Sequence, residues 1–145
     1  KDKHLHPKYA PVNRYATDII GCLNNWVDGW IDWNMVLDRQ GGPNWFKNWC
    51  VAPVIVDPEK DEVYFTPLYY VMAHFSKFMR PGAVKIGCTI SNSELIATAV
   101  QNPDGSIAVA IFNPSEKSHS IEIKLNNNKT NVTIPAKALQ TVVIK

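Results

Sequence analysis

The sequence carries little net charge and contains no long apolar run. Lys and Arg total 15 against 13 Asp and Glu, a formal net charge of +2, and no basic cluster suited to a phosphate backbone is present. We therefore expect no nucleic-acid partner. No apolar stretch approaches the ~20 residues that cross a bilayer, and the opening KDKHLHPK lacks a signal-peptide core. Because 46% of residues are hydrophobic and 19% charged, an intrinsically disordered chain is excluded.

Cysteine is scarce, and none of it forms a CxxC motif. Cys22, Cys50 and Cys88 are widely spaced and odd in number, which argues against a zinc site or a disulfide framework. Free thiols are expected, and a single disulfide remains an open alternative. His4 and His6 could chelate a metal, but isolated histidines near a chain end are more often solvated. We therefore expect no metal and no cofactor.

The composition changes near residue 80, and all five tryptophans precede that point. After Pro11, apolar residues recur at spacings of three and four, which predicts one helix; they are Val12, Ala16, Ile19, Leu23 and Trp26. An aromatic, strand-like run over Trp30–Asn34 follows Gly29, and it leads to a loop that carries Gly41-Gly42-Pro43.

Local signals organise the rest of the chain. Two apolar runs around residues 58–61 predict a hairpin, and Thr66-Pro67 begins a helix predicted to reach Met79. His74 within it is expected to be a hydrogen-bonded packing residue. From residue 83 onward alternating β-branched residues predict five or six short strands, with a hairpin turn at residues 102–105.

Aromatic and amide side chains alternate in the first part of the chain. Trp30, Asp32, Trp33 and Asn34 are followed by the loop residues Asn44, Trp45, Asn48 and Trp49. Indole rings stack on the C–H faces of sugars, and amides bind hydroxyls, so the pattern is compatible with a carbohydrate site. Composition alone favours the alternative, in which the tryptophans pack and the asparagines serve turns.

Four segments resemble, in order, the C-terminal stretch of the glucosylceramidase-like glycoside hydrolases of family 30. They are YATDIIGCLNNWVDGWIDWN, LDRQGGPNWFKNW, APVIVDPEKDEVYFTPLYYVMAHFSKFMRPGAVKIG and VQNPDGSIAVAIFN. The resemblance implies an α/β plus all-β fold, in which the last strand and helices of a (β/α)8 TIM barrel precede an antiparallel β-sandwich. Residues 1–80 would be the barrel part and residues 81–145 the sandwich. Since the chain begins at Lys1, we expect it to be processed or cut from something longer.

The resemblance also implies site residues. Trp33, at the carboxyl end of the last barrel strand, matches a tryptophan that lines the glucose pocket, and Asn48 matches a loop asparagine that binds the sugar. Asp32 would point away from Trp33 and form a structural hydrogen bond. The family's two catalytic glutamates lie upstream of the matched region, and no Glu precedes Glu59 here, so no catalytic residue is expected in this chain.

Two functions follow from these expectations. The first is the C-terminal part of a retaining β-glucosidase that acts on a glycolipid or oligosaccharide β-glucoside, with the N-terminal remainder of the same enzyme as its partner and inactive without it. The alternative is a non-catalytic carbohydrate-binding or structural β-sandwich module. A free-standing module has no use for the barrel strand and helices predicted over residues 26–48. The sequence leaves the cellular compartment unknown.

Overall fold

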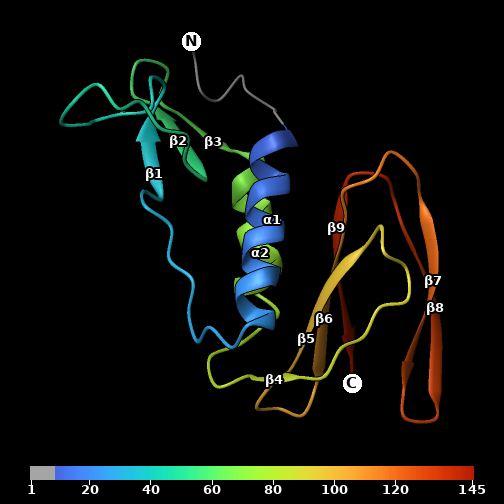
Figure 1. Cartoon of the computed structure of the whole chain (residues 1–145). Coiled ribbons are helices and arrows are strands. Elements are labelled where there is room, and N and C mark those ends of the chain that lie inside the picture. Colours follow the sequence, from blue (N-terminus) through green and yellow to red (C-terminus); the bar gives the residue numbers. More distant parts are fainter. Residues whose placement is uncertain (1–8) are drawn as a thin grey trace.

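The computed structural model describes residues 9–145, which form two helices and nine strands (Figure 1). In chain order these are α1 Tyr9–Asn24, β1 Val36–Asp38, β2 Val54–Asp57, β3 Glu62–Phe65, α2 Pro67–Ser76, β4 Val84–Ile86, β5 Ile96–Gln101, β6 Ile107–Asn113, β7 His119–Leu125, β8 Asn128–Ile134 and β9 Ala138–Ile144. Within these residues neither helix is long and apolar enough to span a membrane. All three cysteines are free.

The first predicted helix is confirmed as α1, although its ends differ from the prediction. Ala16 and Ile19 are buried as the spacing indicated, whereas Trp26 lies past the helix end and is 76% exposed. The helix terminates because Trp26 adopts a positive φ of 65°. This lets the Val27 N–H reach the Cys22 carbonyl at 3.1 Å, the closing bond of a Schellman cap.

The predicted strand over Trp30–Asn34 is wrong for this chain. The paired strand β1 begins only at Val36, and residues 30–34 have no hydrogen-bonded strand partner within residues 9–145. A strand exists only through a ladder with a neighbour, so an alternating pattern without one stays an unpaired extended segment. Downstream, β1 pairs in parallel with β2, and β2 pairs with β3 in the predicted hairpin.

The helix predicted from Pro67 is confirmed as α2 and ends at Ser76, three residues before Met79. Pro67 occupies its first turn, where a missing N–H costs nothing. The hydroxyl of Thr66 does not cap the helix; it is buried and lies 2.9 Å from the Ala52 carbonyl and 3.0 Å from that of Pro53. Thr66 therefore ties the start of α2 to the segment that enters β2.

The second part of the chain forms two antiparallel sheets. One has the order β4-β5-β6-β9, and the other is the β7-β8 hairpin. The predicted hairpin at residues 102–105 is confirmed by the pairing of β5 with β6. The first of the strands expected from residue 83 onward is β4, which has only three residues.

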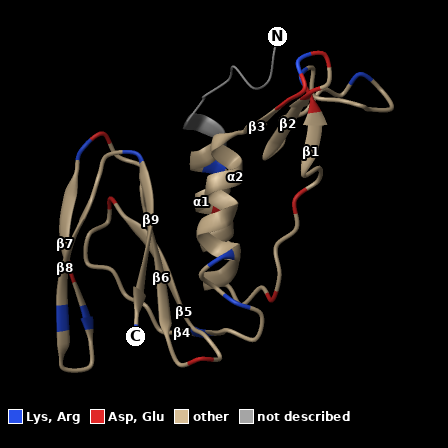
Figure 2. Ribbon diagram, turned by 180° about the vertical axis from the view of Figure 1, so that it is seen from behind, with Lys and Arg blue, Asp and Glu red and all other residues tan. Residues whose placement is uncertain are grey.

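Strand β6 has two apolar faces, and each is covered by a different layer. Ala110 and Phe112 belong to a core shared with both helices, while Val109 and Ile111 belong to a second core that includes Ile134 of β8. In Figures 1 and 2 the helices and the β7-β8 hairpin accordingly lie on opposite sides of the larger sheet. The three layers are helices, sheet and hairpin, in keeping with a barrel portion joined to a β-sandwich.

We predict that Asn102→Ala lowers the free energy of unfolding by about 2–3 kcal/mol, because it leaves partly buried backbone groups without partners. In the wild-type protein the Asn102 side chain accepts a hydrogen bond from the Arg80 N–H at 2.9 Å. It donates to the Phe78 carbonyl at 2.9 Å and to Ser106 Oγ at 3.1 Å. Urea unfolding measures the change. Asn127→Ala, at an exposed turn position, is the matched control and should stay within about 0.5 kcal/mol of wild type. Equal effects of the two substitutions would contradict the prediction.

Candidate functional site

The segment that carries Trp33 runs extended between α1 and β1 (Figure 1). Its side chains alternate in exposure: Trp30 and Asp32 are partly buried, whereas Ile31 is 94% and Trp33 85% exposed. Alternation with a period of two is the geometry of a strand. Trp33 thus lies on the face away from α1, in the extended segment before β1; the strand expected to end at this tryptophan is not formed here.

Helix α1 holds the opposite face of this segment through two polar anchors. The Tyr15 hydroxyl donates to both Asp32 carboxylate oxygens, at 2.9 and 2.8 Å, and Trp30 Nε1 donates to Asp18 at 2.7 Å. The Tyr15 and Trp30 rings meet edge to face with centroids 5.3 Å apart. Burial, followed by the hydrogen bond to Asp32, raises the pKa of Tyr15 to about 12. The structural role expected for Asp32 is confirmed.

Asn48 lies in the loop between β1 and β2, and its side chain is exposed. The loop leaves and re-enters the sheet through a narrow neck, where the Cys50 N–H donates to the Gly41 carbonyl at 3.0 Å. Gly41 has φ 93°, and a Cβ there would lie 2.1 Å from the Cys50 carbonyl oxygen, so the neck requires glycine. Trp45, near the tip of the loop, is 97% exposed.

Trp33 and Asn48 therefore flank β1, one before the strand and one in the loop after it. Both present exposed side chains. No hydrogen bond or ring contact joins the two within the part of the chain that the structure describes. Their assignment to a sugar site stays a prediction.

All five glutamates lie on the surface, and each has a polar partner. The partners are Arg39 for Glu59, the Tyr64 hydroxyl for Glu62, His119 for Glu94, Lys137 for Glu116, and Lys124 with Lys129 for Glu122. The five glutamates lie in the β2-β3 hairpin and in the sandwich, on segments other than those that carry Trp33 and Asn48.

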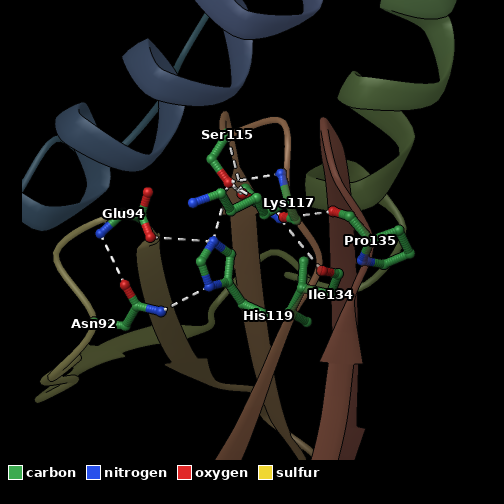
Figure 3. Close-up of polar contacts among 8 residues, drawn as sticks. Asn92, Glu94, Ser115, Lys117, His119, Ile134 and Pro135 are labelled. Carbon is green, nitrogen blue, oxygen red and sulfur yellow. Dashed lines mark hydrogen bonds and ion pairs between the residues drawn. The ribbon is translucent and has the colours of Figure 1, made fainter.

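A cluster around His119 has the residue types of a hydrolytic triad, and sequence reasoning missed it because its members come from separate loops (Figure 3). Ser115 Oγ lies 3.0 Å from His119 Nε2, and Glu94 lies 3.5 Å from the same nitrogen. In a working triad the acid binds the other ring nitrogen. Here the Asn92 amide nitrogen lies 3.1 Å from His119 Nδ1. Asn92 Oδ1 accepts a hydrogen bond from the Glu94 N–H at 2.9 Å, which orients the amide. The cluster therefore ties loops together rather than activating a nucleophile.

Other candidate groups have structural partners. His74 Nδ1 lies 3.0 Å from Thr141 Oγ1, and burial lowers the pKa of the imidazole, which confirms its packing role. His4 and His6 lie outside the described residues. Within residues 9–145 no group of three potential metal ligands comes together. In the part of the chain drawn in Figure 2, positions of both Lys or Arg and Asp or Glu occur in the helical part and in the sandwich.

Comparison with known proteins gives consistent matches along the chain. The model of the glycosyl hydrolase family 30 TIM-barrel domain matches residues 2–79, and that of the family 30 β-sandwich domain matches residues 82–142. The lysosomal acid glucosylceramidase of Mus musculus is 40% identical over 76% of this chain and 22% of its own length. The chain spans about a quarter of the length of the curated relatives it matches, 22–29% for three of them.

Solved structures agree with these sequence matches. SrfJ from Salmonella typhimurium superposes with a TM-score of 0.88 at 27% identity, covering 91% of this chain and 30% of that protein. The endo-β1,6-glucanase BT3312 gives a TM-score of 0.78 at 29% identity, covering 88% of this chain and 30% of the glucanase.

We predict that Tyr15→Phe lowers the free energy of unfolding by about 1.5–3 kcal/mol at neutral pH, because it deletes hydrogen bonds to a carboxylate. The folded-state pKa of Tyr15 is raised from 10.0 to about 12, so its stabilising effect is complete below pH 10 and is lost as the pH rises through about 12. Urea unfolding of both proteins should give the same difference at pH 7 and pH 9. A difference that disappears by pH 9 would contradict this prediction.

Proposed function

The chain belongs to glycosyl hydrolase family 30, and from this membership we propose that it is the C-terminal part of a retaining β-glucosidase resembling glucosylceramidase. The observation that carries the proposal is the alternating segment over residues 30–34, which has no strand partner within residues 9–145. One face of this segment is exposed, as the interior face of a barrel strand would be without the rest of the barrel. The other face contacts α1. We retain the division of the chain into a barrel part, residues 1–80, and a sandwich part, residues 81–145.

The direction of this alternation supports Trp33 as a wall of the sugar site. In a TIM barrel the helices surround the strands, so a strand side chain that points away from its helix points toward the barrel interior. Trp30 and Asp32 contact α1, and Trp33 lies on the other face. An indole there can stack on the apolar face of a glucose ring. Asn48, in the loop that follows β1, would add an amide that binds a sugar hydroxyl.

Two unfilled places support a larger enzyme that completes this chain. Ile31 and Met35 are exposed on the same face as Trp33, where other strands of the barrel would pack beside the sugar site. A cavity of about 620 Å³ lies between the larger sheet and the β7-β8 hairpin, lined partly by Ile86 and Ile123. Apolar surface of this kind is normally buried, so we infer that the N-terminal remainder of the enzyme packs at both places.

The chemistry of the intact enzyme would be double displacement. One carboxylate attacks the anomeric carbon while a second carboxylic acid protonates the leaving oxygen, and water then hydrolyses the glycosyl-enzyme. Both carboxyl groups would come from the remainder, because the glutamates of this chain lie in surface pairs away from Trp33. This chain would supply binding groups for a β-glucoside of a glycolipid or oligosaccharide, and it would be inactive alone.

In an enzyme that contains this segment, we predict that Trp33→Ala lowers kcat/KM for a β-glucoside at least about tenfold, because stacking and placement near the reacting centre are both lost. Trp45→Ala is the matched control, since that ring is also exposed but lies near the loop tip; it should have a much smaller effect. Steady-state kinetics on variants with wild-type melting temperatures measure both. A loss of less than about threefold for Trp33→Ala, below 1 kcal/mol, would make Trp33 a packing residue.

We further predict that the isolated 145-residue chain is poorly stable or aggregates. Its extended segment lacks a strand partner, and its aromatic face is exposed, which is a recognised aggregation hazard. Size-exclusion chromatography and thermal melting of the purified chain test this. A monomer with a cooperative melt would count against both the aggregation and the proposal that the chain is part of a larger enzyme.

A further inference from the structure

The carboxylate of Asp38 gathers three consecutive backbone N–H groups at the neck of the loop that carries Asn48. Asp38 Oδ1 accepts from Gln40 N at 2.8 Å, from Gly41 N at 3.0 Å and from Gly42 N at 2.9 Å. Three donors on one oxygen make a compact turn whose shape depends on where that oxygen lies.

The backbone closes the same neck. The Asp38 N–H donates to the Gly42 carbonyl at 2.7 Å, the Gly41 N–H donates to the Asp38 carbonyl at 2.9 Å, and the Cys50 N–H donates to the Gly41 carbonyl at 3.0 Å. Asp38 is the last residue of β1 and pairs with Val56 of β2. The Asp38 backbone is therefore fixed in the sheet, and the hydrogen bonds to its carboxylate hold residues 40–42 of the loop in place relative to the sheet.

Beyond the neck the loop has little else to hold it. Residues 43–49 are all exposed, and the loop projects beyond β1 and β2 (Figure 1). Asn48 accepts a bond from the Cys50 thiol at 3.3 Å through its backbone carbonyl, which leads back to the neck. The backbone of the loop that carries Asn48 is thus tied to the sheet through residues 38–42 and through Cys50.

We propose that Asp38 is a positioning residue, which orients the Asn48 amide toward the sugar by holding the loop neck through Oδ1. The inference rests on the proposed function, in which Asn48 binds a glucoside hydroxyl. It adds that the geometry of Asp38, and not its charge, is what the site requires. All the hydrogen bonds that the carboxylate accepts within residues 9–145 go to Oδ1, so an amide oxygen at the same place can replace it.

The test is a double-mutant cycle in an enzyme that contains this segment, with 4-nitrophenyl β-D-glucopyranoside as the substrate. Asn48→Ala should lower kcat/KM on the order of 10–100-fold, the cost of an unpaired hydroxyl in the site. Asp38→Ala should lower it about tenfold, mainly through KM. The double variant should fall within about threefold of Asn48→Ala alone, because Asp38 acts through Asn48.

Two further variants separate positioning from a general loss of structure. Asp38→Asn keeps the accepting oxygen and should stay within about threefold of wild type, whereas Asp38→Glu keeps the charge, displaces the oxygen and should be impaired. This pair also serves if Asp38→Ala does not fold. Asp104→Ala is the matched control, because Asp104 accepts from Ser106 N and Oγ at a turn of the sandwich and should leave KM unchanged. Loss of folded enzyme would lower kcat and not change KM.

The outcomes distinguish failure of the positioning role of Asp38 from failure of the sugar-binding role of Asn48. If Asn48→Ala has a clear effect but the losses of the two single variants multiply in the double variant, Asp38 acts independently and the positioning role is overturned while the sugar site stands. If Asp38→Asn is as impaired as Asp38→Ala, the role is overturned as well. If Asn48→Ala has no effect, both the assignment of Asn48 and the inference built on it fall. Non-additivity together with rescue by asparagine supports the role.

Discussion

The burial of β6 on both faces is the constraint on which the other elements depend. A strand that reads Ile-Ala-Val-Ala-Ile-Phe has no polar face to turn to water, so it must be covered twice. Phe112 and Ala110 are covered by the helices, and Val109 and Ile111 by the hairpin. As a result, the helices that precede residue 80 and the strands that follow it share one core.

This arrangement also determines where the candidate sugar residues lie. Helix α1 packs against the sheet through residues such as Ile20, while Tyr15 holds the extended segment through Asp32. Trp33 is left facing away from the whole packed body. The segment then enters β1, whose last residue fixes the loop of Asn48. The two candidate residues thus belong to one continuous stretch of chain that is anchored at both ends of β1.

Elements with local signals could be predicted from the sequence. Pro67 after Thr66, the turn at residues 58–61 and the turn at residues 102–105 each act over a few residues, and each proved correct. The strand over Trp30–Asn34 could not be predicted reliably, because strand formation requires a partner that local alternation does not reveal.

The residues of the candidate site also differ in whether a local sequence signal could predict them. Trp33 and Asn48 came from a resemblance, and no contact in the described chain tests them. The Asp38 turn has a local signal, an Asp with glycines three and four residues later, that could have been recognised. The His119 cluster has none, because Asn92 and Ser115 reach it from different loops.

The narrow neck of the Asn48 loop has a consequence for how this segment can diverge. A side chain at Gly41, where φ is 93°, would collide with the Cys50 backbone, whereas a Cβ at Gly42 would lie 2.9 Å from the Trp49 ring, which would have to shift. Trp45 and Phe46 at the tip meet no such barrier, since both are almost fully exposed. The loop therefore combines a neck that requires glycine at position 41 with a tip whose side chains project into solvent, so we expect substitutions at the tip to leave the neck unchanged.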